Sequence, residues 1–260
     1  VERMSVHIRV VTPVFPTGLT HQSDFEGLLG AEDCIDFVEL EEGPVSLEGA
    51  FDEALAAAAT VARIIEAEAE GADAVVVDCM EDPGVRAGRE AVSIPVLGPC
   101  ETCMHLACTL GRRFSILSVS ARMRALFDAQ ARLYGVSTAY ASTRAVEIPV
   151  LELEAAGDEL VDRLHKAAVE AVVQDWADTL VLGCTGMKGV AKKLQERLAA
   201  DGLMVPVIDP IPTTVRMAKV LAACELTHSK AAYPNPHPKR LFGFEGSALH
   251  TVTGRSGDDG

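Results

Sequence analysis

Short hydrophobic runs alternate with longer amphipathic segments along most of this chain. The run at residues 74–77 is apolar throughout, the run at 6–11 is rich in valine and isoleucine, and the run at 35–40 reads I-D-F-V-E-L. A long Ala-rich segment that ends at Gly71 separates the second run from the third. A short apolar run bounded by turns is typical of a parallel strand buried on both faces, so the pattern predicts an α/β fold.

The alternation continues in the second part of the chain. It predicts a parallel sheet there as well, with helices between the strands. The expected elements are strands at 114–119 and 136–141 and helices at 121–134, 158–176 and 213–224.

One stretch of this pattern occurs twice. Residues 72–84 read A-D-A-V-V-V-D-C-M-E-D-P-G and residues 177–189 read A-D-T-L-V-L-G-C-T-G-M-K-G, which places Cys79 and Cys184 at equivalent positions, 105 residues apart (184 − 79). A P-V-L-G-P segment follows the first copy, and a P-V-I-D-P segment follows the second at nearly the same distance. Each copy predicts a buried strand that ends in a cysteine, at the sheet edge where open α/β folds bind their ligands.

The repeat indicates two lobes of similar build. We expect a first α/β lobe from residues 1–98 plus 207–226 and a second α/β lobe from residues 99–206. Residues 227–260 contain closely spaced prolines and end in glycine and charge, which predicts an extended arm or a disordered tail. Such an arm suits packing on a neighbouring subunit, so we expect a homo-oligomer.

Helix-capping signals follow both cysteines. Asp82 is followed by a proline, which is the usual sequence of an N-cap and the first residue of a helix. In the second copy Thr185 is the predicted N-cap. Ser46 is predicted to cap the Ala-rich helix. Both thiols are therefore expected near the positive end of a helix dipole, which lowers the pKa of a cysteine from its free value of about 8.5.

Composition narrows the classes of partner. The chain has 260 residues, is 48% hydrophobic and carries a formal net charge of −15, which disfavours binding to phosphate backbones and anionic lipid. No apolar run approaches the roughly 20 residues that span a bilayer, and the first ten residues lack the apolar segment of a secretion signal. We therefore expect a cytoplasmic protein without nucleic-acid or membrane partners. Seven cysteines, an odd number in a chain of this size, predict reduced thiols.

Two thiols on opposite sides of one carbon can act as a general base and a general acid. Removing a proton from a carbon next to a carbonyl and returning one to the opposite face inverts that centre, and each enantiomer needs its own base. One cysteine in each lobe therefore favours a racemase or epimerase over a hydrolase, which needs a Cys-His pairing on one side. Backbone N–H groups would hold the enolate, and we expect no metal and no cofactor if the carbon is already acidic.

Residues near the predicted strand ends are candidates for binding a small-molecule substrate. The loop after the first strand lies at the same sheet edge as the cysteines, and two candidates flank Cys79. Hydroxyl groups in the other loops can donate hydrogen bonds. The candidates are Thr12, Phe15, Ser46, Asp78, Met80, Ser118, Thr185 and Gly186.

The stretches around both cysteines resemble the Asp/Glu/hydantoin racemase family, in particular its hydantoin racemase-like branch. The likeness spans residues 5–225 and includes G-P-V-S-L-E-G-A-F-D-E-A, I-P-V-L-G, G-R-R-F-S-I-L-S and the pair D-C-x-x-D-P-G and L-G-C-T-G-M. The resemblance implies two flavodoxin-like lobes related by a pseudo-twofold axis, with the active site in the cleft between them. It also implies a cofactor-independent isomerase in which Cys79 and Cys184 are the two acid/base residues.

Two departures from the family pattern bear on the substrate. Residues 12–15 read T-P-V-F where the family usually has Asn-Pro-Asn-Thr or a close variant, and Met80 and Glu81 stand where hydantoin racemases more often have Phe and Gly. The leading hypothesis is a hydantoin-like or amino-acid-like substrate with a carbonyl-activated Cα–H. The alternatives are a decarboxylase or a cis–trans isomerase of the same superfamily, and a non-catalytic protein that binds small molecules or senses thiol oxidation.

The cysteines of one other segment have a simpler interpretation. Cys100, Cys103 and Cys108 lie near His105, and a C-x-x-C arrangement is a weak metal or redox signal on its own. The apolar spacing of this segment predicts an ordinary helix that faces the core.

Overall fold

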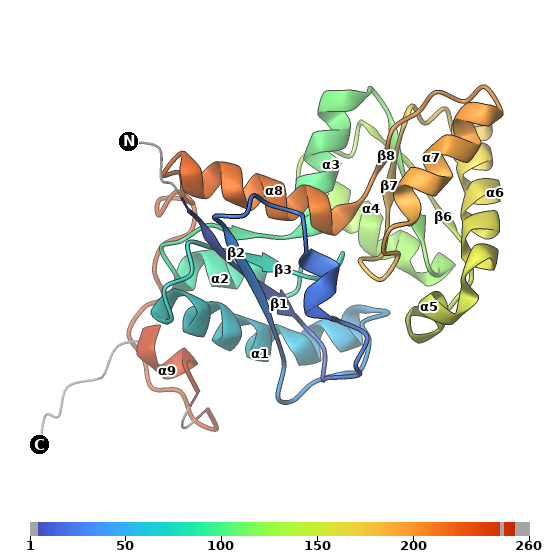
Figure 1. Ribbon diagram of the computed structural model, residues 1–260. Coiled ribbons are helices and arrows are strands. Elements are labelled where there is room, and N and C mark those ends of the chain that lie inside the picture. Colours follow the sequence, from blue (N-terminus) through green and yellow to red (C-terminus); the bar gives the residue numbers. More distant parts are fainter. Residues whose placement is uncertain (1–4, 245–246, 253–260) are drawn as a thin grey trace, which may run out of the picture.

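The computed structural model describes residues 5–244 and 247–252, which form two lobes, each built on a parallel four-stranded sheet (Figure 1). The first sheet has the strand order β2-β1-β3-β4. All of its pairings are parallel, as the hydrophobic pattern predicted. Its strands are β1 (His7–Thr12), β2 (Cys34–Glu39), β3 (Ala74–Val77) and β4 (Val96–Leu97).

The second sheet repeats the topology of the first. Its strand order is β6-β5-β7-β8, so β7 takes the inner place that β3 has in the first sheet. Every residue of β3 and β7 is buried, as expected for inner strands of a sheet covered on both faces. The strands are β5 (Phe114–Ser118), β6 (Tyr140–Ala145), β7 (Thr179–Leu182) and β8 (Val207–Ile208). The predicted α/β fold with two parallel sheets is confirmed.

Helices connect the strands and cover the sheets. In the first lobe α1 lies on one face of the sheet and α8 on the other (Figure 1). The α-helices are α1 (Ala50–Ala69), α2 (Val85–Ala91), α3 (Pro99–Leu110), α4 (Arg124–Leu133), α5 (Leu153–Ala156), α6 (Asp158–Gln174), α7 (Val190–Ala200), α8 (Pro210–Ala223) and α9 (Leu249–Val252). Short 3-10 helices are η1 (Gln22–Phe25), η2 (Ala121–Met123) and η3 (Val150–Glu152).

Two helices cross between the lobes and pack against one another. Helix α3 follows β4 of the first sheet, but its buried side chains, such as Met104, belong to the core of the second lobe. Helix α8 follows β8 of the second sheet, and its buried side chains, such as Val215, belong to the core of the first lobe. Residues 207–208, which we placed in the first lobe, pair with β7, so the chain returns to the first lobe at Pro210.

The strand expected at 136–141 lies four residues later in the chain, at β6 (140 − 136). This strand is at the edge of its sheet, and Thr143 is its one buried residue. An edge strand needs no continuous apolar run, so the hydrophobic pattern does not mark it. Val136, which suggested the earlier start, is buried in the turn region after α4.

The predicted N-cap at Asp82 is wrong. Helix α2 has Gly84 at its N-cap, while Asp82 has a positive φ of 52°. Its carboxylate instead accepts hydrogen bonds from the N–H groups of Cys100 and Glu101, at 3.0 and 2.9 Å, and from the hydroxyl of Tyr134 at 2.7 Å. Asp82 therefore caps α3 and ties the loop after β3 to the second lobe.

Ser46 and Thr185 do not cap their helices either. Gly49 occupies the N-cap of α1 and Gly189 that of α7, and a glycine has no side chain that could form the capping hydrogen bond. Ser46 donates a hydrogen bond to Oε1 of Glu48 at 3.1 Å. In each case the helix begins later than the sequence signal indicated, which leaves the hydroxyl group in the loop before it.

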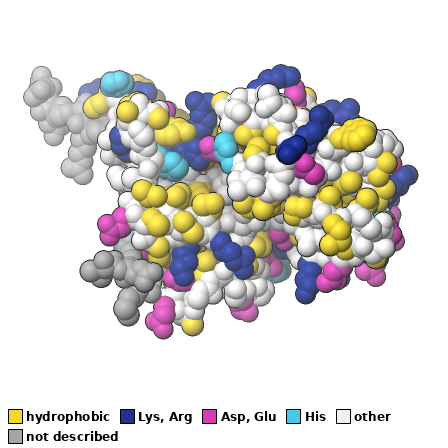
Figure 2. Space-filling model, turned by 90° about the horizontal axis from the view of Figure 1, so that it is seen from above, with side chains coloured by type: hydrophobic (Ala, Val, Ile, Leu, Met, Phe, Trp, Pro, Cys, Tyr) yellow, Lys and Arg dark blue, Asp and Glu magenta, His cyan; other side chains and the backbone are white. Residues whose placement is uncertain are grey.

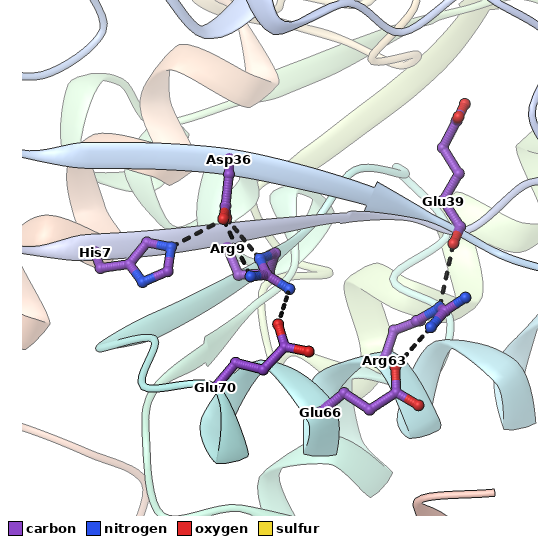
Figure 3. A network of polar contacts seen from close by, with 7 residues as sticks. All are labelled: His7, Arg9, Asp36, Glu39, Arg63, Glu66 and Glu70. Atoms are coloured by element: carbon purple, nitrogen blue, oxygen red, sulfur yellow. Dashed lines mark hydrogen bonds and ion pairs between the residues drawn. The ribbon is translucent and has the colours of Figure 1, made fainter.

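A charged network joins α1 to the first sheet (Figure 3). The guanidinium group of Arg9, on β1, donates from Nε and Nη2 to the carboxylate of Asp36 at 2.6 and 3.1 Å. Its Nη1 donates to Glu70, at the end of α1, at 2.9 Å. Arg63 of the same helix donates to the backbone C=O of Glu39 at 3.2 Å. These contacts satisfy the buried Arg9 side chain and fix the helix on the sheet.

The first part of the predicted arm packs on the first lobe without helix or strand. Nζ of Lys230 donates to the backbone C=O groups of residues 89, 90 and 92, at the end of α2, at 2.9, 3.0 and 2.7 Å. Tyr233 lies under the guanidinium group of Arg89, whose Cζ is 5.4 Å from the ring centroid. Residues 245–246 and 253–260 of the predicted tail lie outside the described residues.

Charged side chains are scattered over the face of the molecule seen from above (Figure 2). Lysine and arginine lie among acidic and hydrophobic side chains there and do not gather in one patch. In the part of the chain that the structure describes, no helix has the length and apolar character needed to cross a membrane.

Candidate active site

A cavity of about 490 Å³ lies between the two lobes, beyond the carboxyl ends of β3 and β7. Residues from both lobes line it, including the loop after β1, both cysteines of the repeat and residues at the start of α6. Its volume suits a small organic ligand. The place corresponds to the binding edge expected for parallel α/β sheets.

The two cysteines of the repeat lie in equivalent surroundings. Cys79 and Cys184 each come two residues after a fully buried strand, and each is partly exposed. The N–H of Glu81 donates to Sγ of Cys79 at 3.4 Å, and the N–H of Gly186 donates to Sγ of Cys184. The electrostatic effect of Cys184 also raises the pKa of Cys79. Each lobe thus brings to the cavity one sulfur with one backbone donor.

Both thiols have raised pKa values, contrary to the helix-dipole prediction. Burial raises the pKa of Cys79 well above its usual value, and the carboxylate of Glu81 raises it further. Burial raises the pKa of Cys184 to about 12, although the N–H of Gly186 lowers it in part. Helices α2 and α7 begin six residues after the cysteines (85 − 79 and 190 − 184), beyond the reach of their dipoles. Near neutral pH both groups are therefore protonated in the ligand-free protein.

Six of the eight predicted binding residues line the cavity. The hydroxyl of Thr185 donates to the backbone C=O of Asp78 at 3.3 Å, which joins the second lobe to the first beside the sulfurs. The hydroxyl of Thr12 donates to Oδ2 of Asp78 at 3.4 Å. The six lining residues are Thr12, Ser46, Asp78, Met80, Thr185 and Gly186. Their contact with a substrate remains a prediction.

Phe15 and Ser118 do not line the cavity. The backbone N–H of Phe15 donates to the C=O of Pro44 at 2.8 Å, and its side chain is exposed, while Val14 lines the cavity. Ser118 is fully buried at the end of β5, and its neighbour Val119 lines the cavity instead. Successive side chains of an extended segment point in opposite directions, so an error of one residue moves a side chain out of the site.

Several charged residues of the cavity were not predicted as site residues, Lys188 and Glu81 among them. Lys188 of the second lobe donates to the backbone C=O of Leu19 at 2.6 Å and pairs with the carboxylate of Asp24, so it fastens the loop after β1 across the cleft. Glu81 lines the cavity and is 1% exposed. Its departure from the family's glycine was the signal that could have marked it.

The other cysteines lie away from this arrangement. Cys100 and Cys103 are buried on α3 in the core of the second lobe, which confirms the prediction that this segment faces the core. Cys108, farther along the helix, is exposed. Within residues 5–244 and 247–252, no group of three or more His, Cys, Asp and Glu side chains is placed to hold a metal ion.

Comparison with known proteins extends the likeness to the whole fold. Residues 24–218 match the family model described as Asp/Glu/Hydantoin racemase. The chain is 34% identical over 243 residues to a hydantoin racemase of Rhizobium meliloti, a match that covers 92% of this chain and 99% of the relative. A hydantoin racemase of Paenarthrobacter aurescens is 33% identical, with coverage of 91% and 100%.

A solved structure shows the same arrangement of both lobes. The allantoin racemase from Klebsiella pneumoniae superposes with a TM-score of 0.86 at 30% sequence identity. The match covers 94% of this chain and 98% of that chain. The likeness therefore includes both copies of the repeat and the cleft between them.

Proposed function

The chain belongs to the Asp/Glu/hydantoin racemase family and is an isomerase, and we propose that it inverts a carbonyl-activated Cα–H centre through two cysteines without a cofactor. The observation that carries the proposal is the placement of Cys79 and Cys184, one from each lobe, at equivalent positions of one cavity. The proposed substrate is hydantoin-like, because relatives that match nearly the full chain are named hydantoin and allantoin racemases.

The proposed reaction moves one proton at each face of the substrate carbon. The thiolate of one cysteine takes the Cα proton, and the C–H electron pair passes to the neighbouring carbonyl oxygen to form an enolate. The thiol of the other cysteine then gives its proton to the opposite face, and the enolate electrons re-form the carbonyl. After the reaction the first sulfur is a thiol and the second is a thiolate. The enzyme is then in the protonation state that accepts the opposite enantiomer.

Backbone N–H groups of the two cysteine loops are suited to support this chemistry. Those of Glu81 and Gly186 point at the sulfurs and would stabilise whichever one is a thiolate. Those of Met80 and Thr185 follow the cysteines and form no backbone hydrogen bond in the described part of the chain. We assign these two donors to the enolate oxygen, because both residues line the cavity.

The raised thiol pKa values predict a rate that increases with pH. Because the pKa values of both cysteines lie above the usual range, only a small fraction of each thiol is ionised between about pH 7 and 9. In that range the thiolate fraction of the free enzyme should grow about tenfold per pH unit. The value of kcat/KM should rise in the same proportion for a substrate that does not itself ionise there. A pH profile by polarimetry measures this, and a flat or falling profile would argue against a thiolate base.

Incubation of the wild-type protein with single enantiomers tests the proposed activity. In deuterated buffer, a panel of hydantoins, allantoin and free amino acids should include a compound that loses optical rotation and gains deuterium at Cα. The double variant Cys79→Ser/Cys184→Ser should match the enzyme-free rate. A protein that only binds small molecules would leave both the rotation and the isotope content at that background.

A further inference from the structure

The cleft departs from twofold symmetry at one position of the cysteine loops. Glu81 and Gly186 are equivalent in the repeat (186 − 81 = 105), and each donates its N–H to a sulfur. A Cβ atom at residue 186 would lie 3.2 Å from Cδ1 of Leu153 and 3.5 Å from Sγ of Cys184. The second lobe is tightly packed there, so this position offers a functional side chain from the first lobe alone.

The carboxyl group of Glu81 lacks the partners that buried carboxyl groups normally have. The residue is 1% exposed, and neither carboxyl oxygen forms a hydrogen bond with any described residue. The backbone N–H of Gly49 acts on the carboxyl group and lowers its pKa in part, but it lies outside hydrogen-bonding geometry. A buried polar group without a donor costs free energy, which indicates that a donor arrives in the functional state.

The strongest charges around this carboxyl group are of its own sign. Burial, together with the carboxylates of Glu53, Asp52 and Glu48, raises the pKa of Glu81 to about 7. The carboxylates of Glu81 and Glu48, which belong to the first lobe, also raise the pKa of Cys184 in the second lobe. Glu81 lines the same cavity as both sulfurs, and its surroundings favour a positively polarised partner.

We propose that Glu81 is a specificity-determining residue that accepts a hydrogen bond from a nitrogen atom at the end of the substituent on the reacting carbon. This inference rests on the proposed racemase function. Rotation of the Glu81 side chain would turn the carboxyl group toward a donor in the cavity that this residue lines. The substituent can keep one position while the proton passes between the two sulfurs, so a single residue in one lobe can hold both enantiomers. Ammonium and ureido ends suit this site, and a carboxylate end is repelled.

Four hydantoins whose side chains carry different terminal groups test this inference. The hydantoins derived from lysine and citrulline end in ammonium and ureido groups, that from norleucine in a methyl group and that from glutamate in a carboxylate. For the wild-type protein, kcat/KM should be roughly tenfold higher for the first two than for the norleucine compound, and lowest for the glutamate compound.

Variants of Glu81 should remove this preference. With Glu81→Gln, the kcat/KM ratio of the lysine compound to the norleucine compound should fall toward one. Glu81→Gly, which repeats the residue of the other lobe, should do the same. The matched control is Glu42→Gln, an exposed residue, which should keep the wild-type ratio.

The outcomes separate this inference from the proposed function. If the wild-type protein racemises the norleucine compound as fast as the nitrogen-ended compounds, or if the Glu81 variants keep the preference, the role of Glu81 is wrong and the racemase stands. If none of the four compounds is racemised, the hydantoin substrate class and the role of Glu81 both fall.

Discussion

Serine in place of Cys79 or Cys184 is expected to reduce kcat for racemisation by about a thousandfold, the scale of a general acid/base contribution. A single remaining thiol can remove a proton from one face of the carbon but has no partner that returns a proton to the other face. The hydroxyl group that replaces the sulfur keeps the shape of the site, yet it is a much weaker acid than a thiol. Polarimetry of each purified variant measures the loss.

A third cysteine supplies the control for this experiment. Cys108 is exposed near the end of α3 and lies outside the cavity lining, so Cys108→Ser should racemise at the wild-type rate. Circular dichroism of all three variants establishes that the fold is retained. Racemisation within tenfold of the wild-type rate in either Cys79→Ser or Cys184→Ser would rule out the two-thiol mechanism.

Replacement of Asp82 by alanine is expected to lower the free energy of unfolding by about 3 kcal/mol. The carboxylate satisfies the N–H groups of Cys100 and Glu101 and the hydroxyl of Tyr134, all of which lie at the junction of the lobes. Alanine leaves these donors without an acceptor, and it is also strained at the φ of 52° that this residue has. Urea unfolding followed by circular dichroism measures the change.

Asp82→Asn is the matched variant, because asparagine tolerates a positive φ and keeps one acceptor oxygen. Burial raises the pKa of Asp82 from 3.8 to about 6, so the folded state holds the proton more tightly than the unfolded state. The stability that this proton contributes is complete below about pH 4 and is lost as pH rises through about 6. The asparagine variant should lack this pH-dependent loss and remain more stable than the alanine variant. An alanine variant as stable as the wild type would contradict the bridging role.

Gly98 provides an independent check of the same contact. A Cβ atom at this position would overlap with Cγ of Asp82, because the carboxyl group packs directly on the glycine. Gly98→Ala should therefore displace the Asp82 side chain and destabilise the protein in the same way.

The hydrophobic pattern predicts the framework of this protein well for a physical reason. Strands β3 and β7 are covered on both faces, so each needs a continuous apolar run, and the run ends where the chain leaves the core. The carboxyl ends of these strands lie at the sheet edge where parallel sheets bind ligands, and the repeat places one cysteine after each strand. The cavity, with six of the eight predicted binding residues, follows from this topology.

The local capping signals fail because the side chains find partners far away in the sequence. Asp82 precedes a proline and has the pattern of an N-cap, yet its hydrogen-bond partners are 18 to 52 residues distant. Thr185 likewise bonds to Asp78 across the cleft. The polar edge strand β6 and the buried carboxyl group of Glu81 have no periodic signal at all, since the first needs little apolar surface and the second depends on packing between loops.

Isotope exchange in the single cysteine variants tests the central claim most directly. Each variant is incubated in deuterated buffer with each enantiomer, separately, of the fastest substrate in the panel, and deuterium at Cα is followed by NMR. The two-thiol mechanism predicts that Cys79→Ser exchanges only one enantiomer and Cys184→Ser only the other, because each remaining sulfur reaches one face. Exchange of the same enantiomer by both variants, or of both enantiomers by either one, would contradict it.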